Sequence, residues 1–236
     1  MRFEAFSLNN IDEFEDHKVV NFLYNVGGLY GIVAVHSMGA DGLACFGASR
    51  LWCYHSYNEA IRDVLRLSKT MSYKSIMAGL PYGGAKGVIM GTPFNLQNRK
   101  MLFSNYANHI KGVGNFITGA DVGLTIEDLV VMRKTNSSIV GLKGDPVRFT
   151  ALGMYCSIQL CLGEIFGSED ISNRTFAIQG LGNIGIAILH LIYGRAKRIV
   201  VADIDDGQVQ IAKSLFPNIE IISSTEIHKV KVDVFS

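Results

Sequence analysis

The chain has 236 residues, of which 48% are hydrophobic, enough for one large or two small cores and too many for a disordered chain. Its formal net charge is +1, with no dense run of Lys or Arg, which argues against binding to nucleic acid or to an anionic membrane surface. The N-terminus has an early acid, Glu4, and nowhere in the chain do 18 apolar residues run together. We therefore expect a cytoplasmic protein whose partners are small molecules and other subunits.

Cysteines and histidines give no sign of a metal site. The four cysteines, Cys45, Cys53, Cys156 and Cys161, include no Cys-x-x-Cys pair, and a chain of this size needs no disulfide scaffold. The six histidines are scattered and lack the helical spacing that zinc sites use. Metal-dependent catalysis is therefore not expected.

The first part of the chain alternates apolar segments with glycine-rich ones. Residues 28–37 are rich in β-branched and aromatic residues and predict a buried strand, whereas the glycine-rich segment 39–49 predicts a loop. Ser56 and Glu59 have the spacing of a capping box. The apolar residues that follow predict a helix over about 57–75.

Four further elements are predicted in the following segment, in chain order: a turn over 79–87, a strand over 88–90, a helix over 100–112 and a strand over 116–118. The last of these strands ends in a polar loop that contains Asp121. Thr125 and Asp128 have the spacing to cap another helix after that loop.

Turn-forming residues cluster between Gly141 and Pro146, and we place a domain boundary there, between residues 1–143 and 144–236. The second domain is predicted to contain, in order, a helix over 150–166, a strand over 176–180, a helix to about 195, a strand over 199–203, and short apolar segments near 220–222 and 232–235. This order of elements is that of a dinucleotide-binding βαβ unit, which consists of a strand, a glycine turn, a helix and a second strand that ends in an acid. The predicted fold class is α/β, with a Rossmann-type second domain.

The segment Gly180-Leu-Gly-Asn-Ile-Gly185 has the glycine spacing of a phosphate-binding turn. Such spacing also occurs in ordinary turns, but here strands flank it and Asp203 ends the second strand. That carboxylate can accept hydrogen bonds from ribose hydroxyls and would repel a 2′-phosphate, which predicts NAD as the cofactor. The predicted cofactor-binding residues are Gly180, Gly182, Asn183, Ile184, Gly185 and Asp203.

Three motifs carry candidate catalytic residues: Met-Ser-Tyr-Lys74, Gly-Gly-Ala-Lys86 and Asp121-Val-Gly. A lone lysine is usually a solvated surface charge, and an aspartate beside glycines is often only a turn former. Lys86 differs because it lies in a glycine-rich turn between apolar segments, where a long side chain can point inward. In this order, and followed by the glycine fingerprint, the motifs resemble the Glu/Leu/Phe/Val dehydrogenase family over most of the chain, in particular its leucine/phenylalanine/tryptophan branch.

The resemblance implies that Lys74 binds the substrate α-carboxylate, Lys86 is the general acid/base and Asp121 moves protons. It also implies that Thr150 contacts the nicotinamide end of NAD. Chemically, a lysine acts as a base near neutral pH only when desolvation or a neighbouring cation lowers its pKa. The family resemblance predicts reversible oxidation of an L-amino acid to a 2-oxo acid and ammonia, by a homo-oligomer that assembles through its N-terminal substrate-binding domain.

The substrate side chain is predicted from the segment Phe46-Gly47-Ala48-Ser49-Arg50. It resembles the K-G-G-x-R segment of glutamate dehydrogenases, in which the lysine pairs with the substrate's second carboxylate. Phe46 occupies the place of that lysine, and a carboxylate beside a phenyl ring would be desolvated without a partner. We therefore expect an apolar or aromatic amino acid, bound near Phe46, Gly47 and Ala48.

Compared with the family it resembles, the chain stops at Ser236 within the cofactor domain. The resemblance implies that later strands of the sheet, an asparagine-bearing loop near the nicotinamide and a C-terminal helix are missing. An alternative is therefore a catalytically inactive truncated homologue that retains nucleotide binding or only oligomerises. A third interpretation, an unrelated Rossmann reductase, leaves the two lysine motifs unexplained.

Overall fold

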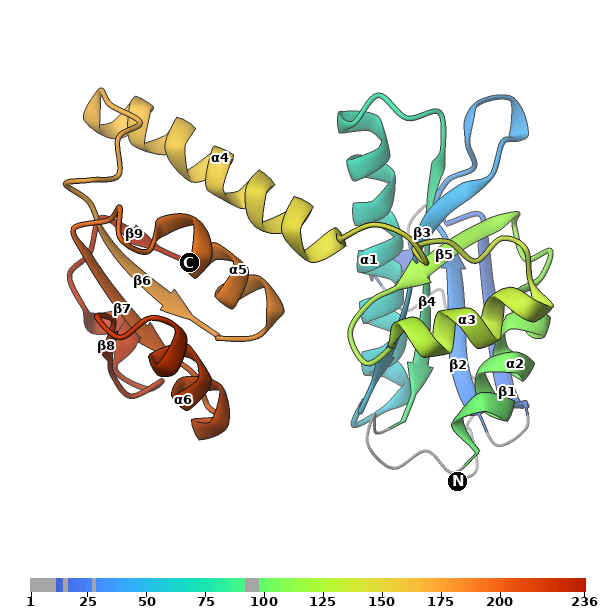
Figure 1. Ribbon diagram of the computed structural model, residues 1–236. Helices are drawn as coiled ribbons and strands as arrows, with labels where there is room; N and C mark the ends of the chain where they lie inside the picture. The colour runs from blue at the N-terminus through green and yellow to red at the C-terminus, as the bar shows by residue number, and fades with distance from the viewer. Residues whose placement is uncertain (1–11, 15–16, 27–28, 92–97) are drawn as a thin grey trace. The chain divides into compact units, whose positions relative to one another are not determined.

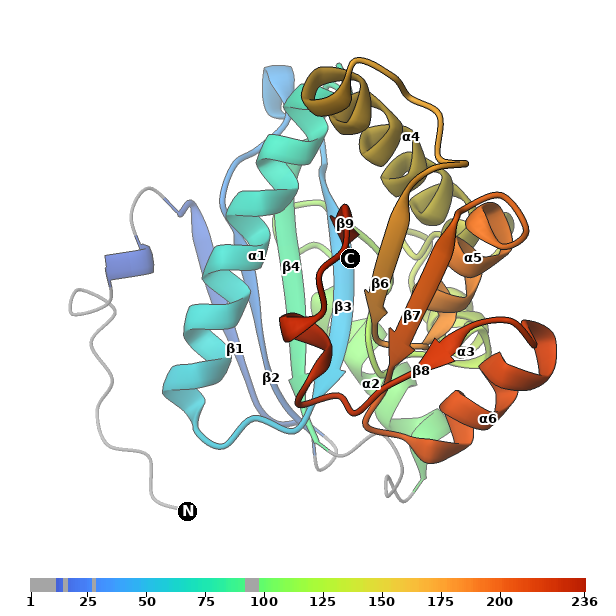
Figure 2. The same ribbon diagram turned by 90° about the vertical axis from the view of Figure 1, so that its left-hand side faces the viewer.

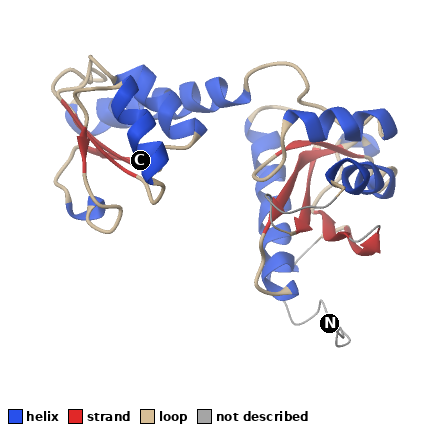
Figure 3. Cartoon of the chain, turned by 60° about the horizontal axis from the view of Figure 1, so that its bottom comes forward, coloured by secondary structure: helices blue, strands red, loops and turns tan. Residues whose placement is uncertain are grey.

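The computed structural model describes residues 12–14, 17–26, 29–91 and 98–236. The chain forms two compact units, Met1–Lys143 and Gly144–Ser236, and each has its own hydrophobic core. Helices and strands are present in both units (Figure 1; Figure 3). The predicted α/β class is confirmed.

The first unit is built on a five-stranded sheet in the order β1-β2-β4-β3-β5. Its strands are β1 (Val19–Val26), β2 (Leu29–Val35), β3 (Cys45–Trp52), β4 (Gly83–Met90) and β5 (Phe116–Ala120). Strands β3, β4 and β5 are parallel, whereas β1 and β2 form an antiparallel pair and β2 runs antiparallel to β4. The predicted strands over 28–37 and 116–118 correspond to β2 and β5, but β1 has no counterpart among the predicted elements.

Two segments predicted as a loop and a turn are strands instead. The loop prediction is wrong from Cys45 onward and the turn prediction is wrong from Gly83 onward. The glycines in these strands allow close packing: a Cβ at Gly47 would lie 1.8 Å from the backbone oxygen of Ala85 on β4. A Cβ at Gly84 would lie 2.1 Å from the backbone nitrogen of Ser72. Glycine within a strand commonly marks such an approach of another backbone.

Helices cover both faces of this sheet (Figure 1). Helix α1 (Tyr57–Met77) packs on β2 and β4, whereas α2 (Arg99–Ile110) and α3 (Ile126–Thr135) enclose the larger core on the other face. Ser56 caps α1 by accepting a hydrogen bond from the backbone of Glu59, and Thr125 and Asp128 form a capping box at α3. These helices and caps match the sequence predictions. Two short 3-10 helices, η2 (Asp12–Phe14) and η3 (Ala40–Gly42), complete the described part of the unit.

The second unit contains a parallel four-stranded sheet in the order β8-β7-β6-β9 (Figure 2). Its elements are α4 (Pro146–Phe166), β6 (Thr175–Gln179), α5 (Asn183–Ile192), β7 (Arg198–Ala202), α6 (Asp206–Leu215), β8 (Glu220–Ile221), η4 (Ile227–Lys229) and β9 (Val234–Phe235). Phe176 and Ile178 of β6 face a core shared with α4, α5 and α6, and Ala177 between them faces a smaller cluster. The predicted order of strand, glycine turn, helix and strand is present.

Helix α4 is the one described helix whose length and composition would allow it to cross a membrane. Core helices of soluble proteins can have the same length and composition. Ala151, Tyr155 and Leu162 of α4 are buried in the core of the second unit, and most of its remaining surface is exposed. A groove of about 810 Å³ runs along α4 and the C-terminal residues 233–236.

Candidate active site

The candidate catalytic lysine lies in the middle of β4, not in a turn as predicted. Its neighbours Ala85 and Gly87 face the core under α2, so the Lys86 side chain points to the opposite face, the one on which α1 packs. Across the sheet, Lys86 pairs in register with Ala48 of β3. The regular strand fixes the direction of the side chain more firmly than a turn would.

Lys86 contacts Asp121, which directly follows β5. The ammonium nitrogen Nζ donates to Oδ2 of Asp121 at 2.6 Å, and Lys86 is only 5% exposed. Burial lowers the pKa of Lys86, and the charges of Arg50 and Lys74 add to this although Asp121 opposes it. Burial would raise the pKa of Asp121, but Lys86 and Arg50 outweigh it and the net shift is downward. The pair therefore combines an ionised carboxylate with an amine that loses its proton more readily than an ordinary lysine.

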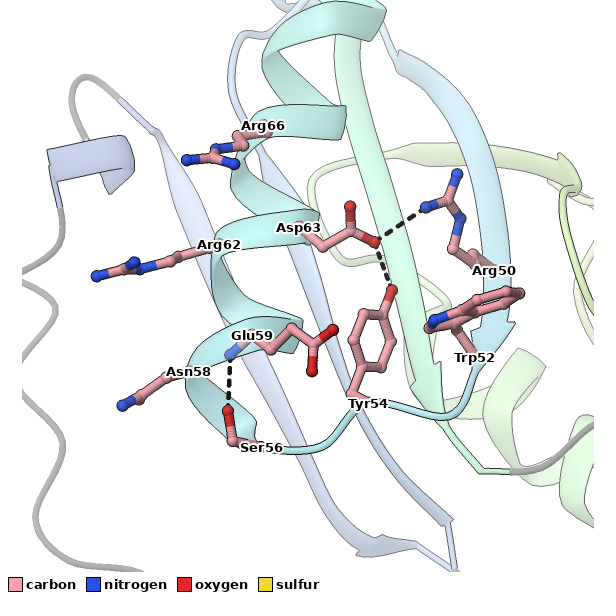
Figure 4. Close-up of a pocket in the computed structure, with 9 residues that line it drawn as sticks. All are labelled: Arg50, Trp52, Tyr54, Ser56, Asn58, Glu59, Arg62, Asp63 and Arg66. Carbon is pink, nitrogen blue, oxygen red and sulfur yellow. Dashed lines mark hydrogen bonds and ion pairs between the residues drawn. The ribbon is translucent and has the colours of Figure 1, made fainter. Parts of the chain in front are cut away.

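Arg50 of β3 is a second partner of Asp121, and it was not among the predicted site residues. Its Nε donates to Oδ2 of Asp121 at 3.0 Å, and its Nη1 donates to Oδ2 of Asp63 on α1 at 3.0 Å. The hydroxyl of Tyr54 donates to the same Asp63 oxygen at 2.5 Å (Figure 4). Arg50 thereby connects the Lys86–Asp121 pair to a cavity of about 670 Å³ beside α1. This cavity is lined by Arg50, Trp52, Tyr54, Ser56, Asn58, Glu59, Arg62, Asp63 and Arg66.

Phe46, Ala48 and Arg50 alternate along β3, so all three side chains lie on the same face of the sheet as Lys86. This alternation is the sequence signal that could have identified Arg50 as a site residue. A loop over 39–49, as predicted, does not give side chains this alternation. Phe46 is half-buried, and its ring centroid lies 6.1 Å from that of Tyr82. The rings of Phe46 and Tyr82 therefore form an aromatic surface on the face that carries Lys86. Gly47, which lies between Phe46 and Ala48 on β3, is buried by strand packing.

Lys74 lies near the C-terminal end of α1, and its side chain is exposed. It is within electrostatic range of Lys86, because its charge contributes to the lowered pKa of that residue. An exposed ammonium next to a buried acid–base pair can bind an anionic group of a small molecule and hold the rest of it against the pair.

The glycine turn of the second unit has the geometry that a dinucleotide would require. Gly180 has a φ of +104°, which favours glycine. A Cβ at Gly185 would lie 2.0 Å from the backbone oxygen of Gly180, so α5 begins very close to the turn. A Cβ at Gly182 would meet nothing within 4 Å, and Gly182 provides α5 with no side-chain cap. The first helical residues, Asn183 and Ile184, therefore have backbone amides suited to a phosphate group.

Asp203 directly follows β7, beside this turn. Its carboxylate accepts hydrogen bonds from the backbone nitrogens of Leu181 and Asp205. Burial raises the pKa of Asp203, but these backbone hydrogen bonds outweigh it and the net shift is downward. Each carboxylate oxygen has a second lone pair, so the ionised group can also accept from ribose hydroxyls. Asp203 therefore fits the position of the acid in a dinucleotide site.

Thr150 lies in the second turn of α4, and its side chain is exposed. Its hydroxyl donates to the backbone oxygen of Pro146 at 2.7 Å. Thr150 also lines the groove along α4, so a ligand bound in that groove could contact it. Among the described residues, no group of three or more His, Cys, Asp or Glu side chains is placed to bind a metal ion.

Comparisons with known proteins show similarity to one family of dehydrogenases. Residues 26–138 match the Glu/Leu/Phe/Val dehydrogenase dimerisation domain. The chain is 30% identical to leucine dehydrogenase from Bacillus cereus over 96% of its length and 63% of the relative's. It is 33% identical to phenylalanine dehydrogenase from Bacillus thermotolerans, over 98% of its length and 63% of the relative's. The crystal structure of L-tryptophan dehydrogenase from Nostoc punctiforme superposes with a TM-score of 0.68 at 30% identity, covering 93% of this chain and 63% of that one. The chain thus spans less than two thirds of the length of these relatives.

Proposed function

Because the chain is homologous to the Glu/Leu/Phe/Val dehydrogenases, we propose that it is an NAD-dependent amino-acid dehydrogenase. The reaction would convert an L-amino acid reversibly into its 2-oxo acid and ammonia. The observation that carries the proposal is the buried Lys86 ammonium, 2.6 Å from Asp121 on a sheet face next to Lys74. A solvated surface lysine would have neither the burial nor the lowered pKa.

Each of the three charged residues has a distinct role in the proposed reaction. Lys74 binds the α-carboxylate and orients the substrate. Neutral Lys86 accepts a proton from the substrate ammonium, so that the nitrogen lone pair can form the C=N bond as hydride leaves the α-carbon. Lys86 passes that proton to Asp121 across the 2.6 Å contact and then accepts a proton from the water that attacks the resulting iminium. Return of a proton to the nitrogen lets the C–N bond break, so that ammonia leaves as the hydroxyl loses its proton and becomes the 2-oxo group. When bound, NAD would supply the hydride acceptor.

The substrate that fits this face has an apolar or aromatic side chain. Phe46 lies on the same face as Lys86 and next to Tyr82, so a substrate side chain there would contact aromatic carbon. A second carboxylate placed against these rings would lose its hydration without gaining a partner. Ala48, opposite Lys86 in the register, adds a methyl group to the same surface.

In the second unit, the amides at the start of α5 would hold the pyrophosphate and Asp203 would bind the adenosine ribose. The open space around Gly182 and the ionised state of Asp203 support this assignment. The negative charge of Asp203 favours NAD over NADP. Thr150 is assigned to the nicotinamide end.

We propose that the protein is a cytoplasmic homo-oligomer that assembles through its first unit, which matches a dimerisation domain. An alternative is a catalytically inactive homologue that retains nucleotide binding or only oligomerises. The short strands β8 and β9, of two residues each, favour this alternative.

The test is NADH formation by the purified chain with a panel of leucine, valine, phenylalanine, tryptophan and glutamate, and with Lys86→Ala as the matched control. We expect turnover of apolar or aromatic amino acids, loss of this turnover in Lys86→Ala, and equal NAD binding by the two proteins in calorimetry. NAD binding without turnover of any amino acid would support the inactive homologue. Equal turnover by Lys86→Ala would reject the catalytic assignment.

A further inference from the structure

We infer that Arg50 is a positioning residue, which holds the Asp121 carboxylate against Lys86 and is itself held by Asp63 and Tyr54. The inference rests on the proposed function for its chemical meaning, because it assigns Arg50 to the deamination site. The contacts that carry it lie entirely within the first unit.

The first observation is that two cations share one oxygen of Asp121. Nζ of Lys86 and Nε of Arg50 both donate to Oδ2, at 2.6 and 3.0 Å. The two nitrogens are therefore no more than about 6 Å apart, close enough for each cation to disfavour the other. Arginine stays charged at every physiological pH, so Lys86 is the one that yields its proton. Arg50 accordingly keeps Asp121 ionised and lowers the pKa of Lys86.

The second observation is that Arg50 is fixed from two directions. Its guanidinium uses Nε for Asp121 and Nη1 for Asp63, and these two side chains and that of Arg50 are each 24 to 28% exposed. Tyr54 donates to the same oxygen of Asp63 as Arg50 does (Figure 4). Burial and the Asp63 charge raise the pKa of Tyr54, which keeps its hydroxyl protonated as a donor. A lysine at position 50 could supply the charge but not this rigid two-sided fork.

The direct test is the pKa of Lys86, measured by NMR titration of the full chain labelled with [ε-13C]lysine. The Lys86 signal is identified by its absence in Lys86→Arg. Removing the guanidinium in Arg50→Met should raise the pKa of Lys86 by about one unit. Arg50→Lys, which keeps a charge, should raise it far less. The matched control is Arg62→Met, which removes an exposed arginine from the cavity of Figure 4 that lacks a contact with Asp121.

The second measurement is the pH dependence of amino-acid oxidation by the same variants. Arg50→Met should lower kcat about 10-fold or more and move the rise of rate with pH upward, in step with the pKa of Lys86. Arg50→Lys and Asp63→Asn should lower kcat with little movement of the pH profile. Both variants weaken the contacts that fix residue 50 between Asp121 and Asp63, but both keep a positive charge at that position. KM should change little in all three, because Lys74 binds the carboxylate.

The two measurements separate the inference from the proposed function. An inactive parent chain would refute the proposed activity, yet the NMR titration would still decide whether Arg50 controls Lys86. An unchanged pKa of Lys86 in Arg50→Met would overturn the inference. So would an equal shift in Arg62→Met, or an unaltered kcat in Asp63→Asn of an active enzyme. If Arg50→Met does not fold, Asp63→Asn and Arg50→Lys supply the decisive comparison.

Discussion

Replacing Asp121 by asparagine would preserve the size of the side chain and remove the charge that Lys86 and Arg50 share. Lys86 is 5% exposed, so its ammonium would be buried without a counter-ion. Breaking a buried ion pair from one side typically costs 3–5 kcal/mol, and the 24% exposure of the Asp121 side chain reduces this. We expect Asp121→Asn to lower the free energy of unfolding by about 2–3 kcal/mol near pH 7.

This loss should depend on pH because Lys86 can release its proton. The pKa of Lys86 lies below its ordinary value of 10.5, and removal of Asp121, which raises it, lowers it further. Between the folded pKa and 10.5 the unfolded chain binds more protons than the folded one, so stability rises with pH in that window. The window is wider in the variant. The stability deficit of Asp121→Asn should therefore shrink as the pH rises from about 7 to about 10.

Urea unfolding followed by far-ultraviolet circular dichroism would measure the deficit, with the single tryptophan, Trp52 of β3, as a probe within the first unit. Lys86→Met and the double variant Lys86→Met/Asp121→Asn complete a double-mutant cycle with Asp121→Asn and the parent. The double variant should be more stable than Asp121→Asn alone, because it contains no unpaired ammonium. A deficit that stayed constant or grew with pH, or a double variant no more stable than Asp121→Asn, would refute the reasoning.

Lys74→Met should raise KM at least about 10-fold with a smaller effect on kcat, since it removes a partner of the substrate in both ground and transition states; steady-state kinetics would show an unchanged KM if this role is wrong. Phe46→Lys should raise kcat/KM for glutamate relative to leucine. Asp203→Ser should narrow the difference between NAD and NADP affinities in calorimetry, and a parent that prefers NADP would contradict the placement of this acid. Gly185→Ala should lower both thermal stability and NAD affinity, whereas Gly182→Ala should weaken NAD binding with little change in Tm.

Hydrophobic periodicity and capping residues were enough to predict most helices. Helix α1 begins at Tyr57 after the Ser56 cap, and α3 begins after Thr125, as their spacing indicated. The signal is local in these cases, because a cap and the first helical turn lie within a few residues of each other. The glycine turn before α5 was predictable because its signal is also local: Gly180, Gly182 and Gly185 lie within six residues.

The glycine-rich strands were not predictable from such local signals. Gly47 and Gly84 resemble loop residues until the positions of Ala85 and Ser72 are known, because the reason for each glycine is a close neighbour in the fold. With 39–49 assigned to a loop, Arg50 had no defined direction, and its contact with Asp121, 71 residues along the chain, could not be inferred.

The glycines of β4 should differ in how they tolerate change during evolution. At Gly84 the nearest neighbour of an added Cβ is the backbone nitrogen of Ser72, so no exchange of side chains on α1 could make room. At Gly87 the nearest neighbour, at 2.1 Å, is the hydroxyl of Tyr106, which a phenylalanine would lack. Position 87 is therefore expected to vary together with position 106, whereas position 84 is closed to any other residue. Randomised libraries of this strand should recover alanine at 87 only with a second change, and never at 84.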